Sequence, residues 1–205
     1  MPAADDIART ERAAIDAILG FWLEEVGVEG WFRSDPALDA QCAEHCGALA
    51  AEAVLGGFRH WQATPPGSLA LLILLDQMPR NIHRGTAAAF AADPLARATA
   101  KRAIAARQDR NFASPARALF TLPLMHSESL ADQDRSVRLT LLAQEGAEIS
   151  DFDRDNRRSA IEHRATIRRF GRFPTRNAAL GRESSEAELA FLATGAAFVK
   201  ATAEP

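Results

Sequence analysis

The spacing of apolar residues along the chain predicts an all-α fold. Near the N-terminus, Ile15, Ile18 and Trp22 recur at intervals of three and four residues, the period of one helical face, which predicts a helix over 7–25. Periodicity and helix start and stop signals predict further helices over 35–56, 68–79, 93–107, 114–123, 129–144, 152–170 and 185–199. We expect about eight or nine helices, stacked as antiparallel hairpins in a bundle or short superhelix.

In the stretch 69–85, the longest apolar run of the chain is followed directly by charged and polar residues. Its first seven residues, 69–75, have no polar face and must be buried on all sides. Asp76, Pro79 and Arg80 follow closely, and the proline is expected to bend or stop the helix because it lacks a backbone donor. The core is therefore expected to meet polar chemistry at this point.

Local signals mark several helix starts. Asp35-Pro36, Asp93-Pro94 and Ser114-Pro115 each place a capping residue before a proline at the first helical position. Ser185 and Glu188 are spaced as a capping box for the last helix.

Composition narrows the class of protein without changing this picture. With 205 residues, 47% hydrophobic and 25% charged, the chain is typical of a globular protein, and we predict a single helical domain over 1–205. The net charge of −3 argues against a dedicated nucleic-acid-binding protein. The acidic N-terminus lacks a secretory signal pattern, and no apolar run approaches the roughly 20 residues of a membrane span. We therefore expect a cytoplasmic protein that binds neither nucleic acid nor membrane, with its oligomeric state left open.

A faint internal repeat is the most informative polar feature. Segments 76–85 and 172–182 each break a helix at a proline, continue with an Arg-Asn pair (Arg80-Asn81 and Arg176-Asn177), and place another arginine beside a glycine. One interpretation is that the guanidinium groups bind one anionic ligand, such as a phosphate or carboxylate. The alternative is structural: these side chains satisfy carbonyls freed at the prolines and pair with neighbouring acids.

Histidines and cysteines offer a second set of candidates. His126 and Glu128 lie near a helix start, and His163 occupies the apolar face of an arginine-rich helix, so the three side chains are candidates for proton transfer or for a divalent metal. A partly buried histidine network is the competing interpretation. Cys42 and Cys46, one helical turn apart, are better explained as buried reduced thiols than as zinc ligands. We predict no metal and no cofactor.

Three ordered motifs carry a family resemblance. In the segments 75–81, 122–128 and 163–177 the chain resembles the bacterial family called domain of unknown function 924, and the resemblance extends over about 18–192. It implies an all-helical, tetratricopeptide-like arrangement, but no established activity. Relative to the family pattern, an aromatic residue is expected at Met78, His83 and Leu124, and a histidine at Thr175. The threonine further weakens the case for metal chemistry.

These observations lead to three functional hypotheses. The leading one is a helical binding protein with a polar pocket for a small anionic ligand or an acidic peptide. The second is a hydrolase-type or isomerase-type enzyme that uses His126, Glu128 and His163 for proton transfer. The third is a scaffold for a protein partner. The residues predicted to line the pocket are Asp76, Arg80, Asn81, His126, Glu128, His163, Arg172, Arg176 and Asn177.

Overall fold

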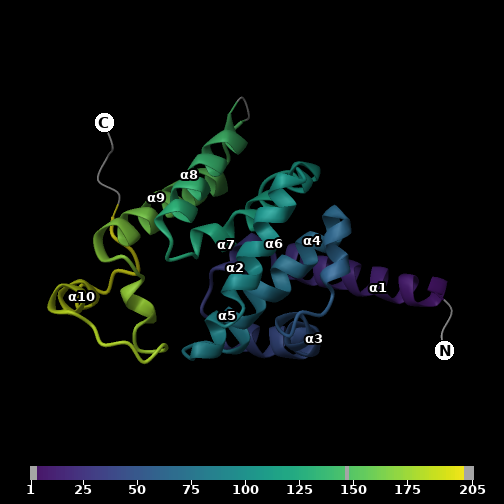
Figure 1. Ribbon diagram of the computed structural model, residues 1–205, viewed down its shortest axis with the longest axis horizontal. Coiled ribbons are helices and arrows are strands. Elements are labelled where there is room, and N and C mark those ends of the chain that lie inside the picture. Colours follow the sequence, from purple (N-terminus) through teal and green to yellow (C-terminus); the bar gives the residue numbers. More distant parts are fainter. Residues whose placement is uncertain (1–3, 146–147, 201–205) are drawn as a thin grey trace. The chain divides into compact units, whose positions relative to one another are not determined.

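The computed structural model describes residues 4–145 and 148–200, and all regular structure within these ranges is helical (Figure 1). The chain forms two compact units. Unit 1 comprises the chain up to Arg84 together with Ala88–Phe120, and unit 2 comprises Gly85–Ala87 and the chain from Thr121 onward. Each unit is described by itself, and the single domain remains a prediction.

Unit 1 begins with a long helix of three parts. Helix α1 (Ala4–Leu19) continues into the π-helical segment η1 (Gly20–Val26) and then into α2 (Gly27–Trp31). The helix expected over 7–25 is therefore extended at its C-terminal end. The last residue of α2 explains the extension, because its ring stacks on that of Trp22 with centroids 6.4 Å apart, and its Nε1 donates to the Trp22 carbonyl at 2.7 Å. Helical geometry past the glycine thus completes a buried tryptophan pair.

Helix α3 (Pro36–Val54) begins where the sequence predicts. The Asp35 carboxylate accepts a hydrogen bond from the backbone N of Ala37 at 2.9 Å, which confirms the predicted cap. The 3-10 helix η2 (Arg59–Ala63) follows and buries Trp61.

The central apolar run lies in a second helix of three parts. Helix α4 (Pro65–Leu72), the π-helical segment η3 (Ile73–Gln77) and α5 (Met78–Ile82) are continuous, and every residue of 69–75 is buried as predicted. Pro79 does not stop the helix. The π-helical turn shifts the hydrogen-bond register just before the residue that lacks a donor, so the chain stays helical through the proline.

The next helix has a different cap from the predicted one. After the 3-10 helix η4 (Ala87–Phe90), helix α6 (Asp93–Ala105) begins with Ala92 in the N-cap position. Asp93 is therefore not the cap. Its carboxylate instead accepts a hydrogen bond from Arg80 at 2.9 Å, because a guanidinium offers a stronger, charged donor than a backbone amide.

The predicted helix over 114–123 is wrong. The 3-10 helix η5 (Gln108–Asn111) precedes this range, and the range itself contains the 3-10 helix η6 (Ala116–Phe120) and the start of the short helix α7 (Leu122–Met125). Prolines at 115 and 123 explain the difference, since each removes a backbone donor and they stand only eight residues apart.

Unit 2 is built on a pair of helices that lie side by side, α8 (Leu130–Gln144) and α9 (Asp151–Phe170) (Figure 1). Both match the predicted ranges within a residue. Helix α9 begins with a capping box that the sequence analysis did not identify, in which Ser150 and Asp153 exchange hydrogen bonds.

The chain ends with shorter elements. The 3-10 helix η7 (Pro174–Arg176) precedes α10 (Glu186–Leu192), whose capping box of Ser185 and Glu188 is confirmed. The last helix was expected to reach residue 199 but ends at residue 192. Gly195 explains this, because its φ of +71° belongs to the left-handed region that typically terminates helices.

The all-α fold class is confirmed. When a helix that passes through a π-helical segment is counted once, the described residues contain eight α-helices, within the expected number. The tetratricopeptide-like arrangement remains a prediction. No helix in the described parts of the chain combines the length and apolar character needed to cross a membrane.

Candidate functional site

The nine residues predicted to line a pocket are divided between the two units. Asp76, Arg80 and Asn81 belong to unit 1, at the junction of η3 and α5. The other six belong to unit 2. The two groups are therefore described separately.

In unit 1 the predicted residues hold local structure together. Arg80 donates to Asp93 at 2.9 Å and to a backbone carbonyl of η4 at 2.7 Å, and it lies 3.7 Å from Asp76. Asp76 is 1% exposed and accepts a hydrogen bond from the Gln77 amide. Asn81 donates to the Gln77 carbonyl at 3.0 Å. These contacts match the structural interpretation of the first Arg-Asn pair.

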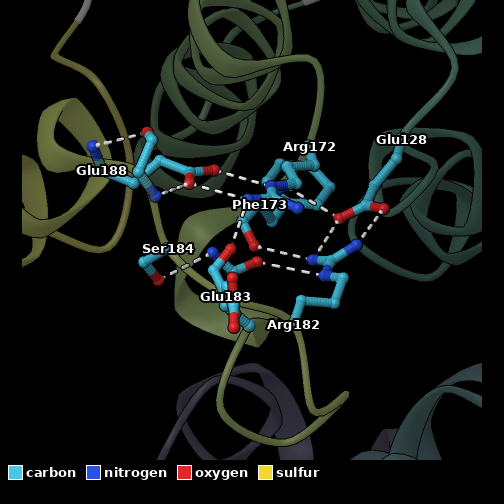
Figure 2. Close-up of polar contacts among 9 residues, drawn as sticks. Glu128, Arg172, Phe173, Arg182, Glu183, Ser184 and Glu188 are labelled. Atoms are coloured by element: carbon cyan, nitrogen blue, oxygen red, sulfur yellow. Dashed lines mark hydrogen bonds and ion pairs between the residues drawn. The ribbon is translucent and has the colours of Figure 1, made fainter.

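In unit 2, Glu128 is held by an arginine and a backbone amide (Figure 2). Arg182 binds both carboxylate oxygens, at 2.8 and 3.0 Å, and the backbone N of Phe173 donates to the same carboxylate at 2.8 Å. Desolvation raises the pKa of Glu128, but the hydrogen bonds from Arg182 and Phe173 outweigh it and hold the pKa below its usual value. Glu128 is thus a charged anchor that joins the start of α8 to the chain beyond α9.

A second arginine in unit 2 binds a second carboxylate. Arg172 contacts both oxygens of Glu188, at 2.7 and 2.8 Å, and donates to the Glu183 carbonyl at 2.7 Å (Figure 2). The side chain of Glu188 is 3% exposed and also accepts the Ser185 amide of the capping box at 2.8 Å. The Arg172 hydrogen bond, followed by that of Ser185, lowers the pKa of Glu188 to about 2.

Arg176 lies near the first of these two ion pairs and has different contacts. Arg176 donates to the His126 carbonyl at 2.9 Å, and its guanidinium carbon lies 4.6 Å from the centre of the Phe173 ring. Its neighbour Asn177 is 1% exposed, donates to Ser184 at 2.9 Å and accepts from Arg182 at 3.0 Å. The second Arg-Asn pair therefore serves both an aromatic contact and the arginine network.

The two candidate histidines lie near each other in unit 2. The rings of His126 and His163 have centroids 6.1 Å apart. His163 is 8% exposed, donates from Nδ1 to the Ser159 carbonyl at 2.7 Å, and stacks on Phe198 with centroids 3.7 Å apart. Phe198, in the segment after α10, therefore covers this ring. The same segment is held against α9 by the backbone N of Val199, which donates to the Thr166 hydroxyl at 2.8 Å.

We name these unit 2 residues the arginine cluster. It consists of His126, Glu128, His163, Arg172, Arg176, Asn177, Arg182 and Glu188. Arg182 and Glu188 were missing from the predicted set. The sequence contained a signal for each, since Arg182 ends the second repeat segment and Glu188 belongs to the predicted capping box. Neither signal indicated which partner each residue would bind.

The arginine cluster carries an excess of positive charge. Arg172, Arg176 and Arg182 contribute three guanidinium groups, and Glu128 and Glu188 contribute two carboxylates. The five groups are close enough to act on one another: both Arg176 and Arg182 lower the pKa of Glu128 by their charge, and Glu128 raises that of Arg172. The cluster therefore gathers three guanidinium groups, the side-chain group that binds phosphate and carboxylate oxygens in bidentate fashion.

The remaining candidates from the sequence are metal ligands and the two cysteine thiols. No group of three or more His, Cys, Asp or Glu side chains within the described residues is arranged to hold a metal ion. Cys42 and Cys46 are free and buried, as expected from their helical spacing. Desolvation raises the pKa of Cys42 to about 12 and that of Cys46 to about 11, so both thiols stay protonated at neutral pH.

Comparison with known proteins places the chain among proteins of unknown function. A family model described as "Bacterial protein of unknown function (DUF924)" matches residues 18–196. A solved structure of a protein of unknown function from Agrobacterium tumefaciens is 36% identical to the chain, with a TM-score of 0.81, and the similarity covers 91% of this chain and 99% of that one. No curated protein matches the chain.

Proposed function

The chain belongs to the DUF924 family of bacterial proteins of unknown function, and from this premise we propose that it is a binding protein for a small anionic ligand. The ligand, a phosphate or carboxylate, is bound by the arginine cluster of unit 2. The observation that carries the proposal is the gathering of three guanidinium groups, those of Arg172, Arg176 and Arg182, within one cluster. Arginine suits such ligands because its planar fork matches two oxygens at once.

Arg176 is the residue assigned to the ligand. Arg176 donates to the His126 carbonyl at 2.9 Å, and its guanidinium carbon lies 4.6 Å from the centre of the Phe173 ring. Its charge also lowers the pKa of Glu128, so it lies within electrostatic reach of the Arg182 pair. A guanidinium held by a carbonyl and an aromatic face presents its planar fork in a fixed direction.

The contacts of the histidines and of Glu128 do not favour proton transfer. A general base needs a pKa near the working pH, and that of Glu128 is held below its usual value. His163 is covered by Phe198, with 8% of its surface exposed. Binding therefore fits the cluster better than the hydrolase-type or isomerase-type chemistry considered above.

The proposal is tested by thermal unfolding of the whole chain with phosphate, sulphate, acetate and citrate. At about one hundred times its dissociation constant a ligand adds about 2.7 kcal/mol, which for a chain of this length raises the midpoint by roughly 5 to 10 °C. We expect such a shift with at least one anion, and its loss in Arg176→Ala.

Arg157→Ala is the matched control, because Arg157 is an exposed arginine of α9 outside the cluster. It should keep the full shift. If no anion shifts the midpoint, or if both variants retain the shift, the proposal is wrong and the cluster is purely structural.

A cytoplasmic location is part of the same proposal. It is supported by the two buried thiols, neither of which has a disulfide partner in the described residues, since free cysteines are typical of a reducing compartment.

A further inference from the structure

Unit 1 contains a cleft that is lined by none of the nine residues predicted to form a pocket. It has a volume of about 410 Å³ and is bounded by η1 and α2 on one side and by the first half of α3 on the other. Its apolar lining includes Phe21, Val26 and Leu38, of which Phe21 and Leu38 are 5% and 8% exposed. The volume falls in the range of small-molecule sites, and polar atoms make up most of the surface that lines the cleft.

The sequence builds both walls of this cleft. On α3, Leu38, Gln41 and His45 stand three and four residues apart and therefore share one face of the helix. On the opposite wall the π-helical turn of η1 places Phe21 against α3, where its ring stacks on that of His45 with centroids 4.6 Å apart and planes within 13°. This ring pair is a rigid aromatic part of the wall.

The charged side chains around the cleft carry more negative than positive charge. Arg33 is neutralised by Asp35 at 3.0 Å, and Asp35 also caps α3. Glu25 projects from η1 into the lining and is exposed, and its carboxylate has no hydrogen-bond or ion-pair partner among the residues that the structure describes. The lining therefore carries a net charge of one carboxylate.

We propose that this cleft binds a small aromatic amine, with the ammonium group on the carboxylate of Glu25 and the ring of the ligand against the Phe21–His45 ring pair. A carboxylate accepts charge-assisted hydrogen bonds from an ammonium group. The ring pair adds contact area for a flat ligand. The site lies in the other unit from the arginine cluster and takes a ligand of opposite charge, so each proposal stands or fails alone.

The experiment compares three probes of similar shape by isothermal titration calorimetry on the whole chain: 2-phenylethylamine, the neutral 2-phenylethanol and the anionic 3-phenylpropionate. We expect saturable binding of the amine. Glu25→Gln should weaken it about three- to tenfold, the range for an ion pair open to solvent. Gln41→Trp should abolish it, because an indole at this exposed position of α3 fills the cleft without disturbing the core.

Glu24→Gln is the matched control, since Glu24 is an exposed glutamate of the same π-helical segment and does not line the cleft. It should bind the amine as the native chain does. Equal loss in Glu24→Gln and Glu25→Gln, tighter binding of the anionic probe, or no saturable binding of any probe would each overturn the proposal.

Discussion

Arginines of similar sequence context have different roles once their partners are known. Arg80 and Arg176 both follow a proline and precede an asparagine, which suggested one shared task. Each arginine donates to a backbone carbonyl and lies over a phenylalanine ring, Arg80 over Phe90 and Arg176 over Phe173. Their surroundings differ, because Arg80 also pairs with Asp93 in unit 1, whereas Arg176 belongs to the arginine cluster of unit 2. The two segments therefore share local contacts and differ in the charged groups around them.

Glu188 gives the sharpest prediction at the residue scale. Its pKa is about 2 in the folded chain, against an ordinary value of 4.5. As the pH falls, the unfolded chain takes up the proton first, so the stabilising effect of the Arg172 pair is complete above about pH 4.5 and disappears towards pH 2. Urea unfolding should show Glu188→Gln less stable than the native chain at neutral pH, with the difference in free energy of unfolding shrinking below about pH 4.5.

Glu186→Gln is the control for this measurement, because Glu186 is an exposed acid in the first turn of the same helix. Its difference from the native chain should stay small throughout. A constant deficit of Glu188→Gln from neutral to acid pH would show that packing, and not the ion pair, explains the loss.

Helices of this chain depart from regular geometry at defined places. The π-helical segments η1 and η3 interrupt two long helices, the first forming a wall of the cleft and the second preceding Pro79. π-helical turns of this kind are rare and occur often at functional sites. Capping boxes at Ser150 and Ser185, by contrast, fix where α9 and α10 begin.

The cap of α9 is testable at the scale of the element. Ser150 accepts from the backbone N of Asp153 at 3.1 Å and donates to its carboxylate at 2.7 Å. Ser150→Ala should lower the free energy of unfolding by about 1 kcal/mol, measured by chemical denaturation. Ser150→Thr keeps a hydroxyl that can both accept from the Asp153 amide and donate to its carboxylate, and it should retain most of the stability. Equal losses in both variants would mean that the serine acts through something other than capping.

Each unit of the molecule has buried apolar residues of its own. Leu74 in unit 1 and Leu124 in unit 2 are both 0% exposed. Packing of this density makes a cavity costly, and the buried run 69–75 supplies most of the apolar side chains of its three-part helix. Whether the chain unfolds as one domain depends on how strongly the two units stabilise each other.

Calorimetry distinguishes one cooperative domain from two. Leu74→Ala and Leu124→Ala should each cost about 2 to 5 kcal/mol, because each leaves a cavity in a closed core. The single-domain prediction requires one heat-absorption peak that both substitutions move to lower temperature. Two peaks, each moved by only one substitution, would replace it with two independently folding domains.

Sequence patterns predicted the helical class, most helix ranges, the burial of residues 69–75 and the caps at Asp35 and Ser185. These features depend on periodicity and on groups within a few residues of one another, which a linear pattern records. The sequence also supplied six of the eight residues of the arginine cluster.

What those residues bind follows from the packing of segments that are distant in the chain. Glu128 and Arg182 are 54 residues apart in the chain, and Arg176 reaches the His126 carbonyl across 50. The stacking of Phe198 on His163 and the cleft between η1 and α3 also join segments that are distant in the chain. Contacts of this kind depend on how distant segments pack, and local spacing does not encode the choice of partner. The burial of periodic apolar positions was therefore predictable, whereas the pairing of side chains and the shape of a site were not.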